Sequence, residues 1–207
     1  MKKKFFLSSL SFIFITAAFS QYIPENNSPK EESTGFKKEN IFIGGGLNLG
    51  FASNTFQVGI SPEIGYSIAE WLDAGIGLNI SYLSQKADPY YYYNNNTRYH
   101  SLNYGGGPFI RIYPIRFLFV QTQFEDNWVK VNIKDNNGYT TKETFASSSL
   151  IAGVGYTQRI VGQSSYYFLV GMDLLNDVNS PYRGFAGGAI PIVRGGFNFY
   201  LRPSHKK

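Results

Sequence analysis

Polar and apolar residues alternate with a period of two along most of the chain beyond residue 40. The clearest runs cover residues 41–51, 56–68 and 72–82, where aliphatic or aromatic side chains take every second position. The positions between them hold mainly Gly, Ser, Asn and Gln, with an occasional charge. Successive side chains of a β-strand point to opposite faces, and a helix would not keep these two sets apart. Each run therefore predicts a strand with one apolar and one polar face.

Five weaker runs extend the alternation, so the pattern predicts eight strands of about 10–13 residues. The weaker runs cover residues 102–113, 117–128, 145–158, 166–175 and 190–201. The links between the runs also alternate in length along the chain. Short links at 69–71, 114–116 and 160–165 alternate with longer links at 85–99, 131–142 and 176–188. Only the short link at 52–55 departs from this pattern. Tight turns on one side and longer loops on the other are typical of outer-membrane barrels. The predicted fold is all-β, an eight-stranded antiparallel up-and-down transmembrane β-barrel over residues 40–202.

Composition indicates which face of the predicted strands points outward. Charged residues make up 16% of the chain, below the roughly 25% of a typical soluble domain. A soluble lipocalin-like barrel, the main competing fold, would need an outer face rich in Lys, Glu and Arg. The polar face here consists mostly of small uncharged residues that fit a narrow lumen, so we expect the aliphatic face to meet lipid. Aromatic residues near strand ends are expected to form interfacial girdles: Tyr66, Trp71, Tyr82, Tyr104, Tyr113, Trp128 and Tyr156.

The first twenty residues have the pattern of a secretory signal peptide. Lysines at positions 2–4 precede an apolar stretch that is shorter than a membrane-spanning helix. Ala18 and Ser20 fit cleavage before Gln21, although an uncleaved anchor is the other interpretation. We expect residues 1–20 to be the signal peptide, 21–39 a flexible periplasmic segment and 203–207 a C-terminal tail. Without the three lysines the formal net charge falls from +5 to +2, so the charge is no argument for nucleic-acid binding.

Five stretches carry a resemblance to a known family. They are IFIGGGLNLGF, VGISPEIGYSIAEWLDAGIGLNISY, SLIAGVGY, LLNDVNSPYRG and the closing VRGGFNFYL. Through them, residues 41–201 resemble small outer-membrane barrels of the OmpX and OmpA-domain type, and in detail a Bacteroidota family of small outer-membrane β-barrel proteins. Gly196, Phe197, Phe199 and Leu201 resemble a barrel-assembly signal, although the tail that follows departs from signals that end on an aromatic residue. The resemblance implies outer-membrane architecture and assigns no activity.

Two features that could suggest chemistry have simpler interpretations. The chain has no cysteine, which excludes a disulfide framework, a thiolate zinc site and a cysteine nucleophile. The glycine clusters at 44–46 and 105–107 lack the Lys-Ser/Thr pair and the helix of a phosphate-binding loop. We expect these glycines to permit barrel coiling and to make room for side chains in the lumen.

Candidate catalytic and metal-binding residues are few. A lipid-modifying enzyme would need a His–Ser–acid set. His100 and Ser101 are adjacent on a predicted strand and therefore point to opposite faces. Asp88, Asp135 and Asp177 lie on the longer links and could bind calcium or lipopolysaccharide-associated cations weakly, but they lack the spacing of an EF-hand. The sequence therefore predicts no catalytic residue, no cofactor and no metal site.

Charged residues on the inward face predict a network that closes the lumen. They are Glu63, Asp73, Arg111, Glu125, Asp173 and Arg194. Counting from the turns places Asp73 level with Arg111, and Asp173 level with Arg194, which predicts two cross-strand ion pairs. Glu63 and Glu125 are left to share an arginine or to contact water. Because an eight-stranded lumen is only wide enough for side chains, we expect little or no conductance.

One predicted loop is rich in aromatic residues. It contains Tyr90, Tyr91, Tyr92 and Tyr93, followed by three asparagines. Aromatic rings beside adaptable amides suit surface contacts, and a surface loop without a dedicated partner is the competing interpretation. We expect a non-enzymatic monomer with an envelope-structural or surface-interaction role. Its partners would be outer-membrane lipid, lipopolysaccharide and the barrel-assembly machinery. A narrow passive porin-like channel is the main alternative, and a lipid-modifying outer-membrane enzyme is the third.

Overall fold

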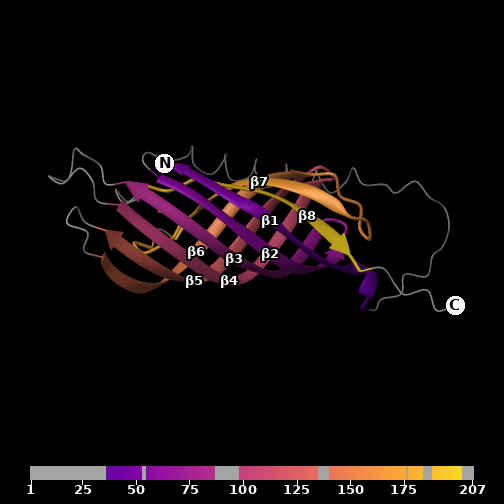
Figure 1. Ribbon diagram of the computed structural model, residues 1–207. Coiled ribbons are helices and arrows are strands. Elements are labelled where there is room, and N and C mark those ends of the chain that lie inside the picture. Colours follow the sequence, from indigo (N-terminus) through magenta and orange to yellow (C-terminus); the bar gives the residue numbers. More distant parts are fainter. Residues whose placement is uncertain are drawn as a thin grey trace, which may run out of the picture. The chain divides into compact units, whose positions relative to one another are not determined.

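The computed structural model describes residues 36–52, 55–86, 98–134, 140–175, 177–183 and 188–201. Within them, eight antiparallel strands pair in chain order and β8 returns to β1, so the sheet closes into a barrel (Figure 1). The strands are β1 (Ile41–Ala52), β2 (Thr55–Ala69), β3 (Leu72–Lys86), β4 (Arg98–Ile115), β5 (Leu118–Lys134), β6 (Thr140–Thr157), β7 (Ser165–Asp173) and β8 (Ile192–Tyr200). The predicted fold class is confirmed.

Helical structure is limited to the short 3-10 helix η1 (Lys38–Asn40), which precedes β1, within the described part of the chain. No helix there is both long enough and apolar enough to cross a membrane. The predicted signal peptide, most of the predicted periplasmic segment and the predicted tail lie outside the described residues.

The strand register fixes how strongly the barrel is staggered. A circuit of paired residues leads from Gly153 in β6 through Gly171, Ile192, Gly50, Gln57, Leu83, Ser101 and Val131 to Glu143, again in β6. Glu143 and Gly153 are ten positions apart in the sequence, so the shear number is 10. A closed sheet of this kind requires strands tilted by roughly 35–45°. Figure 1 shows that the strands run obliquely across the barrel.

The two faces of the strands differ as the alternation predicts. Outward side chains are apolar on all eight strands, as Ile43, Ile60, Ile76, Ile110, Val120, Val154, Val170 and Phe197 illustrate. Inward side chains are polar or charged over much of the barrel, and Asn79, Asn103 and Glu125 are completely buried. An apolar exterior around a polar interior is the arrangement of a transmembrane barrel and the inverse of a soluble one.

The lumen also holds a group of aromatic side chains that the sequence analysis missed. Tyr113 is predicted as a girdle residue, but only 7% of it is exposed and its hydroxyl donates to Asp73 over 2.8 Å inside the barrel. Proximity to a strand end misled that assignment, because Tyr113 shares the inward parity of Arg111. The other buried rings on the strands are Phe42, Tyr99, Phe109, Phe119, Tyr167 and Tyr200, and Tyr182 of the β7–β8 link is buried as well.

Four strands extend well beyond their predicted length. β3 to β6 contain 15, 18, 17 and 18 residues, whereas β7 and β8 contain 9 each. The extensions lie at the end of the barrel opposite the links β2–β3, β4–β5 and β6–β7. We name the end with these three links the turn end and the opposite one the loop end. The extensions were missed because polar side chains take the outward positions there, as Lys130 and Lys134 do on β5, so the apolar outward pattern ends while the pairing continues.

Candidate functional site

An arginine from the β6–β7 link closes the turn end of the lumen. Arg159 Nη2 lies 2.5 Å from Oδ1 of Asp73, and its guanidinium carbon lies 4.2 Å from the centre of the Tyr113 ring. The same group donates to the Ser67 hydroxyl over 2.9 Å and to the Tyr200 hydroxyl over 3.2 Å. Burial disfavours the charged form, but the Asp73 carboxylate together with Tyr113 and Tyr200 outweighs it and raises the pKa of Arg159. The guanidinium therefore stays charged in its position below the barrel.

The next layer surrounds Arg111 with aromatic rings. Its guanidinium carbon lies 5.1 Å from the Phe109 ring centre and 5.0 Å from the Phe119 and Tyr167 ring centres. Arg111 Nη2 lies 3.2 Å from both carboxylate oxygens of Glu63. Both side chains are almost fully buried. The cation–π contacts and the Glu63 carboxylate together offset the desolvation cost of burying the Arg111 guanidinium in the lumen.

The middle of the lumen is organised around Arg194. Its Nε donates to Asn48 over 2.8 Å and its Nη1 donates to Gln123 over 2.9 Å. Its Nη2 lies 3.7 Å from Oε1 of Glu125. Asn48 in turn donates to Ser61 and, over 3.2 Å, to Asn79. These contacts connect five strands of the barrel across its interior.

The link between β7 and β8 closes the loop end of the lumen. Tyr182 is 1% exposed, and its hydroxyl donates to Oε2 of Glu125 over 2.7 Å. Ile190 and Ser180 from the same link are also buried. Burial, and then the neighbouring Glu125 carboxylate, raise the pKa of Tyr182 well above its ordinary value. The hydroxyl therefore remains a hydrogen-bond donor. Tyr182 lies in the stretch LLNDVNSPYRG, which carries the family resemblance, but the link has no periodicity that would reveal an inward direction.

The structure places all six predicted charges inside the barrel but changes their partners. Asp73 and Arg111 are cross-strand neighbours, yet Arg111 bonds to Glu63 and Asp73 bonds to Arg159. A long arginine side chain can reach past its neighbour in a narrow lumen, and the short Asp73 side chain is met by a residue from outside the strands. The predicted pair of Asp73 with Arg111 is therefore wrong.

The second predicted pair is wrong for a different reason. Arg194 lies opposite Leu169, so Asp173 is four residues farther toward the loop end than the prediction assumed. Asp173 instead accepts hydrogen bonds from the backbone N–H groups of Leu150 and Leu175 and from the Ser180 hydroxyl, over 3.0, 3.1 and 2.7 Å. It anchors the β7–β8 link rather than balancing an arginine.

At the loop end, one edge of β6 has no partner strand among the described residues. The last register pair between β6 and β7 joins Ile151 to Asp173, and just beyond it the Ser148 N–H donates to the Asp177 carboxylate over 3.2 Å. From Thr140 to Ser147, β6 pairs with β5 alone among the described residues. The β5–β6 hairpin, residues 118–157, therefore projects past β7 with an unpaired edge.

The enzyme candidates do not come together. His100 stacks on Tyr82 on the outer surface, with a 2.7 Å contact between its Nδ1 and the tyrosine hydroxyl. Ser101 is buried in the lumen, where its hydroxyl donates to Asn103 over 2.6 Å. Asp177 is engaged with Ser148 and Asn179. Tyr90, Tyr91, Tyr92 and Tyr93, together with Asp88 and Asp135, lie outside the described residues.

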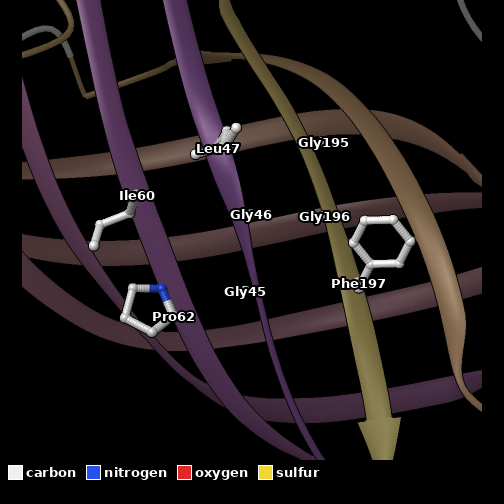
Figure 2. A pocket seen from close by; sticks show the side chains of 8 residues that line it. All are labelled: Gly45, Gly46, Leu47, Ile60, Pro62, Gly195, Gly196 and Phe197. Atoms are coloured by element: carbon white, nitrogen blue, oxygen red, sulfur yellow. The ribbon is translucent and has the colours of Figure 1, made fainter.

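A shallow apolar groove follows the seam between β1 and β8 on the outer face. Figure 2 shows its glycine floor, framed by side chains from β1, β2 and β8. The lining residues are Gly45, Gly46, Leu47, Ile60, Pro62, Gly195, Gly196 and Phe197. A Cβ at Gly46 would lie 2.7 Å from the Gly195 carbonyl oxygen, so the close approach of β1 and β8 requires glycine there. The groove holds no polar side chain and offers no chemistry beyond contact with apolar chains.

No protein-family model matches the chain, and a search of curated proteins finds no match. Among solved structures, the chain is similar to Ail, the attachment invasion locus protein of Yersinia pestis, in complex with the heparin analogue sucrose octasulfate (TM-score 0.49, 7% identity, 78% of this chain and 96% of that one). It is also similar to Neisserial surface protein A and to the N-terminal β-barrel domain of Pseudomonas aeruginosa OprF (both TM-score 0.40, 13% identity, 78% and 96%). At these identities the likeness concerns the barrel architecture.

Proposed function

We propose that this protein is a non-enzymatic outer-membrane barrel with a closed lumen, and that its β5–β6 hairpin binds extended polypeptides at the cell surface. The free edge of β6 is the observation that supports the surface-interaction role. Leu150 and Ser148 direct their backbone groups away from β5, since their N–H groups donate to Asp173 and Asp177. The residues of the same parity farther along the edge are Thr140, Lys142, Thr144 and Ala146.

A free edge of this kind suits β-strand addition. Unpaired N–H and C=O groups in a row form a template for an extended peptide, and natural proteins normally cover or blunt such edges. The side chains of residues 140–144 are exposed and polar, so this part of the hairpin lies beyond the apolar band and in contact with water. A polypeptide could therefore reach it without entering lipid.

The lumen contacts favour this role over a passive channel. Ion pairs at Asp73, Glu63 and Glu125 occupy successive layers, and Tyr182 covers the loop end. An eight-stranded barrel has no spare width for a solute once such side chains fill it. The enzyme alternative lacks a nucleophile–base pair in the described residues, because His100 and Ser101 face opposite sides.

Proline substitution on the free edge tests the binding role. Thr144→Pro removes one edge N–H and places a ring where an added strand would pair, whereas proline is tolerated at an edge position whose N–H faces solvent. We expect cells that display the protein to bind immobilised extracellular proteins, Thr144→Pro to abolish this binding, and the matched Thr144→Ala variant to keep it. Equal binding by both variants would exclude the edge as the binding element.

Orientation is tested by single-cysteine labelling, since the natural chain has no cysteine. We propose that the loop end faces the cell exterior and the turn end faces the periplasm. A membrane-impermeant maleimide should label Thr140→Cys on intact cells and should label Glu70→Cys only after the outer membrane is permeabilised. The reverse pattern would invert the orientation, and recovery of the protein in the soluble fraction would exclude a membrane role.

A further inference from the structure

Three lysines project from the outer face of the β5–β6 hairpin, immediately beyond the aromatic girdle. We name Lys130, Lys134 and Lys142 the lysine face; all three side chains are exposed. They share the outward parity of Trp128, whose exposed ring belongs to the apolar band. Along β1, β2, β7 and β8, from Leu72 to Gln85 on β3 and from Tyr99 to Ile115 on β4, the outward side chains include no lysine or arginine.

The spacing of the lysine face is close enough for joint binding of an anion. Lys142 pairs in register with Asn132, which lies midway between Lys130 and Lys134 on β5. Lys142 is therefore a diagonal neighbour of both, and diagonal neighbours in an antiparallel pair lie about 7–8 Å apart. Flexible lysine side chains span that distance easily, so two ammonium groups can converge on one phosphate.

No acid on the outward face of the described strand positions lies next to these lysines. Asp126 is the only acidic residue on the outward face of the described strand positions, and it lies four residues nearer the turn end than Lys130, where it accepts a hydrogen bond of 2.7 Å from Ser148. Glu143 has the opposite, inward parity. Neighbouring like charges destabilise a sheet, so an external anion would stabilise this face.

The lysine face lies directly above the lipid-contacting belt. Lys130 Nζ lies 5.1 Å from the Tyr104 ring centre, and Tyr104 stacks on Trp128 with the ring centres 5.8 Å apart. Girdle aromatics mark the level of lipid headgroups. Cations just beyond that level meet lipid phosphates.

We propose that the lysine face binds the phosphate groups of lipid headgroups in the leaflet at the loop end. This proposal rests on the membrane location given under the proposed function and adds a partner to it. Lysine contributes a mobile point charge rather than a fixed fork, which suits a headgroup that carries more than one phosphate. Bisphosphorylated lipid A is therefore the probe of choice.

The test measures how much lipid A the purified full barrel retains from mixed vesicles. The barrel is refolded in phosphatidylcholine vesicles that contain a small fraction of lipid A, extracted in mild detergent and analysed by native mass spectrometry. Lys134→Gln/Lys142→Gln is compared with Lys38→Gln/Arg116→Gln, which removes the same charge outside the lysine face. Each lysine near an anionic surface contributes about fivefold in binding. We expect the first variant to retain lipid A on the order of tenfold more weakly, and the second to match the wild type.

The arms of the experiment separate the possible outcomes. Removal of the phosphates from lipid A should weaken its retention by the wild-type protein. The loss should be at least as large as the loss caused by Lys134→Gln/Lys142→Gln with intact lipid A. Equal retention of lipid A by both double variants would overturn the proposal. Equal retention of intact and dephosphorylated lipid A by the wild-type protein would also overturn it. Heparin binding through the same lysines with no preference for lipid A would assign the face to a soluble polyanion and also overturn it. Thr144→Pro keeps all three lysines and should retain lipid A, so a failure of polypeptide binding is distinguishable.

Discussion

The Tyr182 hydroxyl donates a 2.7 Å hydrogen bond to Oε2 of Glu125, so the link between β7 and β8 is fastened to the fifth strand inside the barrel. The same oxygen accepts a hydrogen bond from Asn127 over 3.3 Å, while the other carboxylate oxygen lies 3.7 Å from Arg194. Glu125 therefore joins the cover of the loop end to the central charge layer. This connection makes the cover part of the folded core of the barrel.

Removal of the Tyr182 hydroxyl should weaken this connection measurably. Tyr182→Phe leaves a buried carboxylate with one donor fewer, and hydrogen bonds to charged groups contribute about 1.5–3 kcal/mol. We expect the free energy of unfolding to fall by that amount in urea titrations of the vesicle-embedded barrel. Tyr104→Phe, whose ring lies on the outer face, is the control and should change it little. Equal losses in the two variants would mean that the Glu125 contact does not stabilise the cover.

Arg159 should stabilise the barrel although it belongs to a link. Arg159→Ala leaves Asp73 buried without its cation, and removal of one partner of a buried ion pair costs about 3–5 kcal/mol. Arg159→Ala/Asp73→Asn should recover part of the loss, because the unpaired charge is then gone. Arg116→Ala, in the exposed β4–β5 link, is the control. A double variant as unstable as Arg159→Ala would show that the ion pair is not the cause.

The ion pair of Arg111 with Glu63 predicts the same result for the next layer: removal of the arginine alone should destabilise the barrel more than removal of both charges. Arg111→Met should lower the unfolding free energy by about 3–5 kcal/mol, whereas Arg111→Met/Glu63→Gln should be considerably more stable. Substitution of Asp73 by Asn should not rescue Arg111→Met, since Asp73 is paired with Arg159. Rescue by Asp73→Asn rather than by Glu63→Gln would restore the cross-strand pair predicted from the sequence.

Gly65, which faces the lumen, should matter more than Gly195 of the outer groove. A Cβ at Gly65 would collide with the Phe42 ring, while a Cβ at Gly195 would meet no atom closer than 3.9 Å. Gly65→Ala should therefore cost about 1–3 kcal/mol through overpacking, and Gly195→Ala should be nearly neutral. Thermal unfolding, followed by the heat-dependent shift in electrophoretic mobility, measures both. A neutral Gly65→Ala would indicate that the Phe42 ring can move aside.

Strand number, direction and the two faces could be predicted from the sequence because they depend only on local alternation. On β3, for example, apolar Ile76 and polar Asn79 already indicate which face of the strand contacts lipid. The upper parts of β3 to β6 could not be predicted in this way. Around Lys130 and Lys142 the outward positions are polar, so the apolar outward face that marks the strands elsewhere ends there although the pairing continues.

The lumenal charges could be identified individually but not as pairs. Parity places Arg111 and Asp73 inside, yet parity says nothing about how far a side chain reaches or which link residue enters the lumen. Arg159 and Tyr182 both come from links, where no periodicity exists to reveal an inward direction. Their roles depend on the closed barrel, which brings together residues that are 86 and 57 positions apart in the chain.

The conductance of the purified barrel in planar bilayers tests the closed lumen most directly. Three ion pairs and Tyr182 occupy successive levels of an eight-stranded barrel, so the wild-type protein should be nearly silent under an applied voltage. Tyr182→Ala combined with Glu125→Ala should give at most brief, small openings, because Arg111 and Arg159 still close the turn end. Large, stable and reproducible single-channel currents from the wild-type barrel would contradict a closed lumen and would favour the passive channel.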